Sequence, residues 1–337
     1  MRQKIVWCAL LFVVAIGAIF LGKKVRSSEA KYISNAGQVF GTFYHITYES
    51  PRGIDLQDEV EYQLEVFGES LSTFNPKSCI SRINQNDTVK LTYYLVRVID
   101  SAKAVSQRTD GAFDITVAPL VNLWGFGFEK KAEPSKAVID SIMQFVGYEK
   151  FGRKKWQYIK EDSRVQIDAS AIAKGYGVDV VANRMEELGV KNYMVEIGGE
   201  IVAKGKNPKG NKWSIGINNP TDDMTQASND IIRVVQLDSS AIATSGNYRN
   251  FYYKDGKKVA HTIDPRTGYP VQHSLLSATI KASTCMMADA YATACMVMGV
   301  EKSMELIESL SGVEGYFVVA DENGELQEQY TSGFFEE

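Results

Sequence analysis

The segment HTIDPRTGYP (residues 261–270) gathers side chains that can handle protons or phosphate around a single turn. His261 is a candidate proton acceptor, because the ordinary pKa of a histidine lies near neutrality. Asp264, Pro265 and Gly268 are residue types that form tight turns, and such turns are common on any protein surface. A single histidine is also more often structural than catalytic. The segment on its own therefore indicates either an ordinary hairpin end or one wall of an active site.

A second set of polar side chains lies inside the apolar stretch ADAYATACMVMG (288–299). Asp289 and Thr293 are four residues apart, so on a helix both project from the same face. A carboxylate in apolar surroundings is costly unless something pairs with it. One interpretation is a carboxylate near a helix N-terminus, with Thr293 bonding back to a carbonyl. The other is a hard cation such as Mg²⁺ held by the carboxylate and the hydroxyl, and this stretch alone does not decide between them.

The segment DASAIAKGYGVD (168–179) combines a lysine with glycines at a predicted helix start. Asp168 ends a strand-like run, and Lys174 stands beside Gly175 and Gly177. Backbone N–H groups, the helix dipole and a lysine together suit a diphosphate. The spacing is neither that of a Walker A loop nor that of a dinucleotide-binding Rossmann turn. A generic helix start is the alternative interpretation.

Three further segments are candidates for binding. DGAFDITVAPLVNLWGFG (110–127) joins Asp114 to several aromatic residues, which ordinarily pack in a core but can also support a flat ring system. LSTFNPKSCISRIN (71–84) is rich in Ser and Thr, which commonly cap helices. EIGGEI (196–201) places two glycines in a strand-like run, which indicates a bulge or a backbone that approaches a ligand closely.

Short strand-like runs and helices alternate from Gln38 onward, and these elements must position the polar segments. VFGTFYHITYES alternates as a strand does, and DLQDEVEYQLEVFGESLSTF carries apolar residues at helical spacing. A helix is expected from about Cys285 to Leu310, followed by a final hairpin near GYFVVADENGELQEQY. The mixed order and the many hairpins favour an α+β fold over a doubly wound sheet. No linker interrupts residues 38–337, which predicts one compact unit with two lobes.

The N-terminus has the pattern of a targeting or membrane segment. MRQK is followed by the uncharged apolar run Ile5–Gly22 and then by KKVRSS. This pattern favours an uncleaved inner-membrane anchor over residues 1–22, with the rest of the chain exported. A cleaved signal peptide and a buried core helix are the alternatives. Residues 23–37 read as a polar tether.

The composition excludes some classes of protein. A net charge of −4 argues against broad nucleic-acid binding, which needs a basic face. The 45% hydrophobic and 23% charged content is that of an ordinary globular protein. Cys79, Cys285 and Cys295 have no metal-like spacing, and Cys285 and Cys295 are expected to be buried free thiols.

In their order along the chain, these segments resemble the ApbE family of FAD:protein FMN transferases. The resemblance runs from about Phe40 to Gly299 and rests on GTFYHI, LSTFNPKSCISRIN, GAFDITVAPLVNLWGFG, DASAIAKGYGVD, EIGGEI, SGNYRNF, HTIDPRTGYP and ADAYATACMVMG. It implies an α+β architecture of the T-fold type, with FAD bound in a cleft between two lobes. It also implies dependence on Mg²⁺ and an exported, often membrane-tethered location.

The resemblance further implies roles for individual residues. His261 would help deprotonate the acceptor hydroxyl. Asp289 and Thr293 would bind Mg²⁺, and the backbone carbonyls of Ala171 and Ala292 would join them. Ala171 stands where other members have Ser or Thr, which leaves a backbone contact intact. The positions that would contact FAD are Phe40, Phe74, Ala112, Phe113, Asp114, Asp168, Lys174 and Ile263.

The implied reaction splits FAD, releases AMP and attaches FMN through a phosphoester bond to a Thr or Ser of an acceptor protein. The family suggests a respiratory ion-pump subunit as the acceptor. Mg²⁺ and Lys174 would neutralise the diphosphate at the scissile bond. Two alternatives stay open: a Mg²⁺-dependent FAD pyrophosphatase that passes FMN to water, and a non-catalytic flavin-binding protein. The motifs do not separate the first of these from a transferase.

Overall fold

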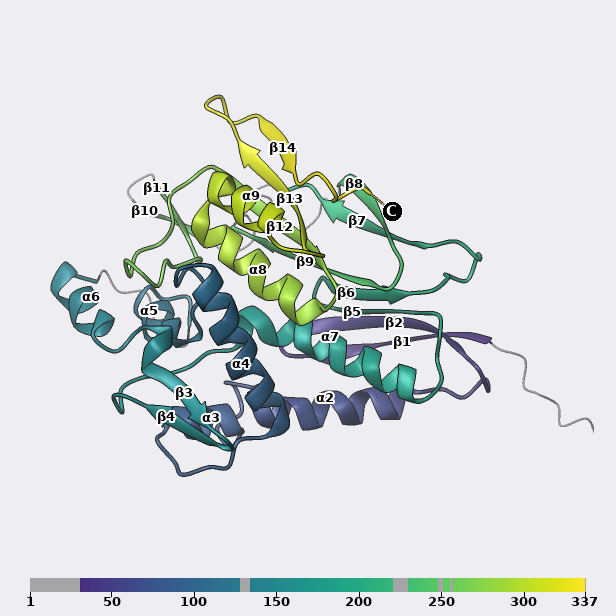
Figure 1. Cartoon of the computed structure of the whole chain (residues 1–337), viewed down its shortest axis with the longest axis horizontal. Coiled ribbons are helices and arrows are strands. Elements are labelled where there is room, and N and C mark those ends of the chain that lie inside the picture. The colour runs from purple at the N-terminus through teal and green to yellow at the C-terminus, as the bar shows by residue number, and fades with distance from the viewer. Residues whose placement is uncertain (1–30, 128–133, 221–229, 248–250, 255–256, 337) are drawn as a thin grey trace, which may run out of the picture.

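The computed structural model describes residues 31–127, 134–220, 230–247, 251–254 and 257–336. The apolar N-terminal run that was expected to be a membrane anchor lies outside these ranges. Within them, none of the helices has the length and apolar character needed to cross a bilayer. The strands and helices of the described ranges form a mixed α/β structure (Figure 1).

The centre of the fold is an eight-stranded antiparallel sheet with the strand order β1-β2-β5-β6-β9-β12-β13-β14. Apolar and polar residues alternate along its strands; in β2, for example, Tyr44, Ile46 and Tyr48 are buried. The eight strands are β1 (Lys31–Val39), β2 (Thr42–Ser50), β5 (Tyr193–Ile197), β6 (Glu200–Lys204), β9 (Ser240–Gly246), β12 (Leu275–Ala282), β13 (Glu314–Ala320) and β14 (Leu326–Tyr330).

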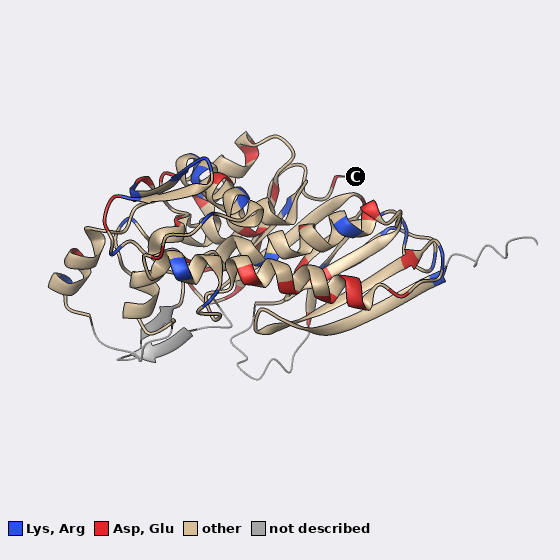
Figure 2. Cartoon of the chain, turned by 90° about the horizontal axis from the view of Figure 1, so that it is seen from below, with Lys and Arg blue, Asp and Glu red and all other residues tan. Residues whose placement is uncertain are grey.

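Helices cover one face of this sheet, and the main core lies between them and the strands (Figure 1). Tyr176, Tyr291 and Phe317 are large members of this core. The helix α2 buries an apolar stripe. Its acidic positions are spread along the helix, which is seen from below in Figure 2. The helices are α2 (Gln57–Leu71), α3 (Cys79–Asn84), α4 (Tyr93–Arg108), α7 (Ser170–Glu187), α8 (Cys285–Met298) and α9 (Val300–Ser309).

A β-hairpin covers part of the opposite face of the sheet. Its strands are β7 (Trp213–Asn218) and β8 (Ile231–Leu237), which pair antiparallel. Trp213 of this hairpin packs in one cluster with Tyr316 of β13 and Phe334 near the C-terminus. The sheet is therefore buried on both faces along its middle strands.

A smaller region of short elements lies at one end of the main sheet (Figure 1). It has an apolar cluster of its own, in which Leu120, Val146 and Ile263 are buried. The His261 turn packs onto this region through Ile263. Its elements are η1 (Ile115–Val117), α5 (Ala118–Leu123), α6 (Lys136–Met143), η2 (Tyr148–Lys150), β3 (Phe151–Lys154), β4 (Gln157–Lys160), β10 (Phe251–Lys254) and β11 (Lys257–Ala260).

The predicted α+β class is confirmed, but three local expectations differ from the structure. Residues 31–37 of the expected tether belong to β1, which pairs with β2 along its whole length. The single helix expected over 285–310 is two helices, because Gly299 has φ +80 and cannot continue α8. The glycines of EIGGEI are not a bulge within one strand: Gly198 and Gly199 form the tight turn between β5 and β6.

Candidate active site

The site is built where α7 and α8 cross at very short distance. A Cβ on Gly175 of α7 would lie 2.2 Å from the carbonyl oxygen of Cys285 on α8 and 2.8 Å from Cβ of Asp289. Real atoms do not approach so closely, so only glycine permits this packing. Gly175 of DASAIAKGYGVD therefore serves helix contact, which brings Lys174 next to Asp289.

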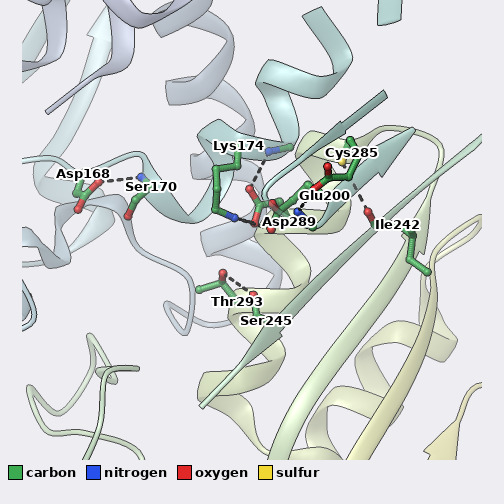
Figure 3. A network of polar contacts seen from close by, with 12 residues as sticks. Asp168, Ser170, Lys174, Glu200, Ile242, Ser245, Cys285, Asp289 and Thr293 are labelled. Atoms are coloured by element: carbon green, nitrogen blue, oxygen red, sulfur yellow. Dashed lines mark hydrogen bonds and ion pairs between the residues drawn. The ribbon is translucent and has the colours of Figure 1, made fainter. Parts of the chain in front are cut away.

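Asp289 is buried between the two helices, with a side chain that is 3% exposed. Its Oδ2 accepts a hydrogen bond of 3.0 Å from the backbone N–H of Gly175, and its Oδ1 lies 3.9 Å from Nζ of Lys174 (Figure 3). Asp289 thus faces α7 and does not cap its own helix. Thr284 and Asp179 cap the N-terminus of α8 instead, so the interpretation of Asp289 as a helix-start carboxylate is wrong.

Lys174 stands between two carboxylates. Its Nζ lies 2.5 Å from Oε1 of Glu200 and 3.9 Å from Oδ1 of Asp289. Burial alone would lower the pKa of Lys174, but the two carboxylates outweigh burial and raise it above its ordinary value. The side chain keeps about a third of its surface exposed, at 34%. Lys174 therefore brings a charged ammonium group, on a partly exposed side chain, to the crossing of the two helices.

Glu200 was not singled out from the sequence, yet it is the closest partner of Lys174. Its side chain is 3% exposed, and its Oε2 makes no hydrogen bond although it is buried. Burial raises the pKa of Glu200, because the loss of hydration outweighs the attraction of Lys174. The one sequence signal was its position directly after the two glycines of EIGGEI.

The N-terminus of α8 is held by a carboxylate from α7. Asp179 accepts hydrogen bonds of 2.8 Å and 2.9 Å from the backbone N–H groups of Cys285 and Met286. Burial raises the pKa of Asp179 to about 6. Cys285 is a buried free thiol, and so is Cys295, as the sequence predicted. Asp179 therefore fixes the start of the helix that carries Asp289.

Thr293 follows Asp289 by one turn of α8. Its hydroxyl pairs with that of Ser245 on β9 at 3.3 Å, as Figure 3 shows. On the α7 side, the helical acceptor of the Gly175 N–H would be the carbonyl of Ala171. That N–H donates to Asp289, so the carboxylate meets α7 about one turn after Ala171. Ala292 is fully buried in the core beside them.

The start of α7 is tied to the Asp114 segment. Asp168 accepts a hydrogen bond of 2.8 Å from the N–H of Ser170, and its own N–H donates to the carbonyl of Ile115 at 2.7 Å. Asp114 accepts bonds of 2.7 Å from both the N–H and the hydroxyl of Thr116. Burial raises the pKa of Asp114 to about 6 in spite of these bonds. Two predicted FAD-contact segments therefore meet at one place.

The remaining predicted FAD contacts lie in different environments. Phe74 is 77% exposed, whereas Phe40 is half-buried at the β1–β2 turn, with φ +51 and its ring 5.5 Å from that of Phe67. A residue with positive φ at a turn tip signals a local constraint. Ala112, Phe113 and Ile263 are buried, so the side chains of these three residues pack in the core.

The His261 segment is a compact turn. The side chain of Asp264 accepts hydrogen bonds of 2.9 Å from the N–H and the guanidinium of Arg266, and Gly268 closes the turn with φ +80. The Asp264 hydrogen bond raises the pKa of Arg266. Arg266 thus stabilises the turn. The ring of His261 lies 6.3 Å from that of Phe126.

The end of β9 links this turn to α8. Thr262, next to His261, donates a hydrogen bond of 2.6 Å to the side chain of Asn247. Ser245, two residues earlier in the chain, pairs with Thr293. The helix is therefore attached to the end of β9, and the turn to the residue that directly follows this strand. Within the described ranges, no group of three or more His, Cys, Asp or Glu side chains could hold a metal ion.

With this fold and site, the chain belongs to the ApbE family, whose model matches residues 40–317. The matched range includes α7, α8 and the His261 turn. The family resemblance inferred from the motifs is confirmed.

Individual relatives agree over almost the whole chain. A FAD:protein FMN transferase of Haemophilus influenzae is 38% identical over 322 residues, which cover 91% of this chain and 92% of the relative. The structure of the flavin transferase ApbE of Vibrio cholerae has a TM-score of 0.81 at 36% identity, over 90% of this chain and 98% of that one. The flavinyl transferase ApbE of Pseudomonas stutzeri in its apo form has a TM-score of 0.82 at 32% identity, over 91% and 97%.

Proposed function

We propose that this protein transfers FMN from FAD to a threonine or serine side chain of an acceptor protein and releases AMP. The observation that carries the proposal is the partly exposed Lys174 side chain, whose ammonium lies beside the buried Asp289 carboxylate at the crossing of α7 and α8. An ammonium group binds phosphate oxygens as a point charge. Relatives that cover the chain nearly end to end are FAD:protein FMN transferases.

We infer that Mg²⁺ binds beside Asp289. Mg²⁺ commonly uses one or two carboxylates, several waters and substrate phosphates, so it does not need a cluster of three acidic residues. Asp289 fits this role, because Gly175 holds Oδ2 while the Lys174 ammonium stays 3.9 Å from Oδ1. The Thr293 hydroxyl and the carbonyls of Ala171 and Ala292 would complete an all-oxygen set. When bound, Mg²⁺ would neutralise charge on the diphosphate.

Lys174 would hold the diphosphate oxygens. It is the charged group at this crossing with exposed surface, whereas Asp289 and Glu200 are each 3% exposed. Its raised pKa keeps it charged at any physiological pH. Asp114 and Asp168, joined through η1, would border the same ligand, and Phe40 and Phe74 would contribute aromatic surface, as the family resemblance implies.

His261 would remove the proton of the acceptor hydroxyl. The hydroxyl oxygen would attack the phosphorus of the FMN half of FAD, forming one P–O bond while the diphosphate bridge bond breaks and AMP leaves. A hydroxyl is a weak nucleophile until a base near neutral pKa takes its proton. Asp264 and Arg266 shape the turn that presents His261, and Thr262 fixes it to β9.

We also propose a cellular location for this chain and the kind of acceptor protein that it would meet there. We infer that the apolar N-terminal run anchors the chain in the inner membrane and that residues 38–337 act outside the cytoplasm. An exported electron-transfer protein, such as a respiratory ion-pump subunit, would then be the acceptor. The support for this is the sequence pattern of the first residues.

The test uses the full-length chain in detergent, incubated with FAD, Mg²⁺ and the flavin-carrying subunit of a respiratory ion pump. We expect flavin fluorescence to remain on the acceptor in a denaturing gel and AMP to appear in equal amount. Replacing the acceptor Thr or Ser by Ala is the control and should abolish the label. Intact FAD with no label would contradict the proposal, and free FMN with AMP but no label would favour hydrolysis.

A further inference from the structure

Glu200 is a buried ionisable group that the proposed reaction does not use. It is the first residue of β6, directly after the turn formed by Gly198 and Gly199, whose φ values are +63 and +102. A Cβ on Gly198 would lie 2.8 Å from the side chain of Thr42, so the turn is closely packed as well as tight. This turn aims the side chain of Glu200 at Lys174 (Figure 3).

The stability of the fold does not by itself explain this arrangement of Glu200. Oε1 of Glu200 has the ammonium of Lys174 at 2.5 Å, but the buried Oε2 has no hydrogen-bond partner. Burying a carboxylate with an unsatisfied oxygen costs free energy, and the attraction within one ion pair can be smaller than this cost. Such an orphaned polar atom calls for an explanation other than packing.

The three charged groups form an unequal triangle. The ammonium of Lys174 lies 2.5 Å from Glu200 and 3.9 Å from Asp289, whose other oxygen is fixed by Gly175. Without Glu200, the nearest counter-charge of the ammonium would be Asp289. A shift of about one ångström would close that contact to the usual ion-pair distance of about 2.8 Å. The ammonium would then compete with a cation for the same carboxylate.

We propose that Glu200 is a positioning residue that holds the Lys174 ammonium away from Asp289, so that the carboxylate stays open to a divalent cation. The inference rests on the proposed function, because it deepens the role of the same site. Glu200 acts through Lys174 and does not touch the ligand: it is 3% exposed, whereas Lys174 is 34% exposed.

The test is a double-mutant cycle on full-length protein in detergent. Binding of Mn²⁺ alone, as a probe for the Mg²⁺ site, is followed by electron paramagnetic resonance in the wild type, Glu200→Gln, Lys174→Met and the double variant. We expect Glu200→Gln to weaken Mn²⁺ binding by about tenfold or more when Lys174 is present, and by less than about threefold in the Lys174→Met background. A direct electrostatic effect of Glu200 on the cation would give equal losses in both backgrounds, and that result would overturn the inference.

A second variant separates position from charge. Glu200→Asp keeps the charge but shortens the reach to Lys174, so we expect a loss of at least about threefold in Mn²⁺ affinity. Unchanged affinity would overturn the inference. The matched control is Glu186→Gln, which removes the carboxylate of another α7–β6 ion pair and should leave Mn²⁺ binding unaltered. If the wild type binds no Mn²⁺ that Mg²⁺ can displace, the proposed metal site itself is contradicted. Equal losses of affinity in the cycle would instead contradict only the positioning role of Glu200.

Discussion

Two ion pairs join α7 to β6, with opposite polarity and in different surroundings. At the inner end, Lys174 of α7 meets Glu200 of β6 at 2.5 Å. At the outer end, Glu186 of α7 meets Lys204 of β6 at 2.8 Å. The inner pair is 34% and 3% exposed, and both partners of the outer pair are 40% exposed. The same two residue types therefore join the same two elements in two environments.

The two glutamates respond to their lysines in opposite directions. Hydrogen bonds from Lys204 and then Tyr193 lower the pKa of Glu186. Burial raises the pKa of Glu200 although its lysine is closer. The difference shows that burial, more than pairing distance, sets the direction in which the pKa of each carboxylate moves. The outer pair is an ordinary surface contact, whereas the inner pair is buried and leaves one carboxylate oxygen without a hydrogen bond.

A glycine inside α7 and another just beyond its end give the largest contrast. Gly175→Ala would place a methyl group 2.2 Å from the Cys285 carbonyl and force α7 and α8 apart. We expect a loss of about 3 kcal/mol in the free energy of unfolding, together with loss of FMN transfer. Gly189, just beyond α7, has φ +86 and no atom near its Cβ position, so Gly189→Ala should cost only about 1 kcal/mol and leave transfer intact. Urea unfolding measures the loss of stability in each variant, and the gel assay measures FMN transfer. Equal losses of stability in the two variants would contradict the close packing at Gly175.

Removing both charges of an ion pair tests how much that pair contributes to the rate of FMN transfer. The double variant Lys174→Met/Glu200→Gln takes out both charges at once, so it leaves no uncompensated lysine. We expect FMN transfer to fall about 100-fold because the diphosphate loses its ammonium partner. Lys204→Met/Glu186→Gln should change the rate by less than about twofold. Rates are measured by AMP release, and similar losses in both variants would show that the inner pair has no special role.

The pH dependence of stability should have opposite signs for the two glutamates. Between its unfolded pKa of about 4.3 and its raised folded pKa, Glu200 keeps a proton in the folded state, so its contribution to stability falls as pH rises. Glu186 has a lowered pKa, so its contribution is present above about pH 4.3 and is lost as pH falls through the folded value. Lys174 and Asp289 face Glu200, and Lys204 and Tyr193 face Glu186.

These slopes are read from urea unfolding in metal-free buffer. The wild type should lose stability relative to Glu200→Gln as pH rises, and should gain stability relative to Glu186→Gln as pH rises. The second effect should stay within about 0.5 kcal/mol because the outer pair is exposed. Slopes of the same sign would mean that burial does not control Glu200.

The outer pair alone should give the smallest effect. A double-mutant cycle on Glu186 and Lys204 should yield a coupling of about 0.5 kcal/mol, which disappears in high salt because exposed charges are screened. A coupling that persists in high salt would contradict its assignment as a surface contact.

The sequence predicted what depends on local spacing. Asp289 and Thr293 lie on one helix at neighbouring turns, and Lys174 lies near a helix start with glycines, so both segments could be identified directly. The sequence did not predict that Gly175 brings the two helices together, because a contact between distant segments leaves no local pattern. It also missed Glu200, since the partner of a buried carboxylate depends on how β6 lies against α7.

Two other differences have similar physical causes. The sequence KYISNAGQV of β1 is too polar to reveal a strand, because β1 is the edge of the sheet and much of it is exposed. Gly299 looked like a glycine within one helix, yet its positive φ separates α8 from α9. The His261 turn was identified from its own residues, but its attachment to β9 through Asn247 was not.

The end of β9 has a consequence for how the protein can vary. Ser245 pairs with Thr293 of α8 while Asn247 binds Thr262 of the histidine turn, and the register of β9 is set by pairing Ser245 with Ala278 of β12. A slip of one residue in that register would displace Thr293 of α8 and the histidine turn together. A substitution that shifts the register of this strand would therefore move two separate parts of the candidate site in one step.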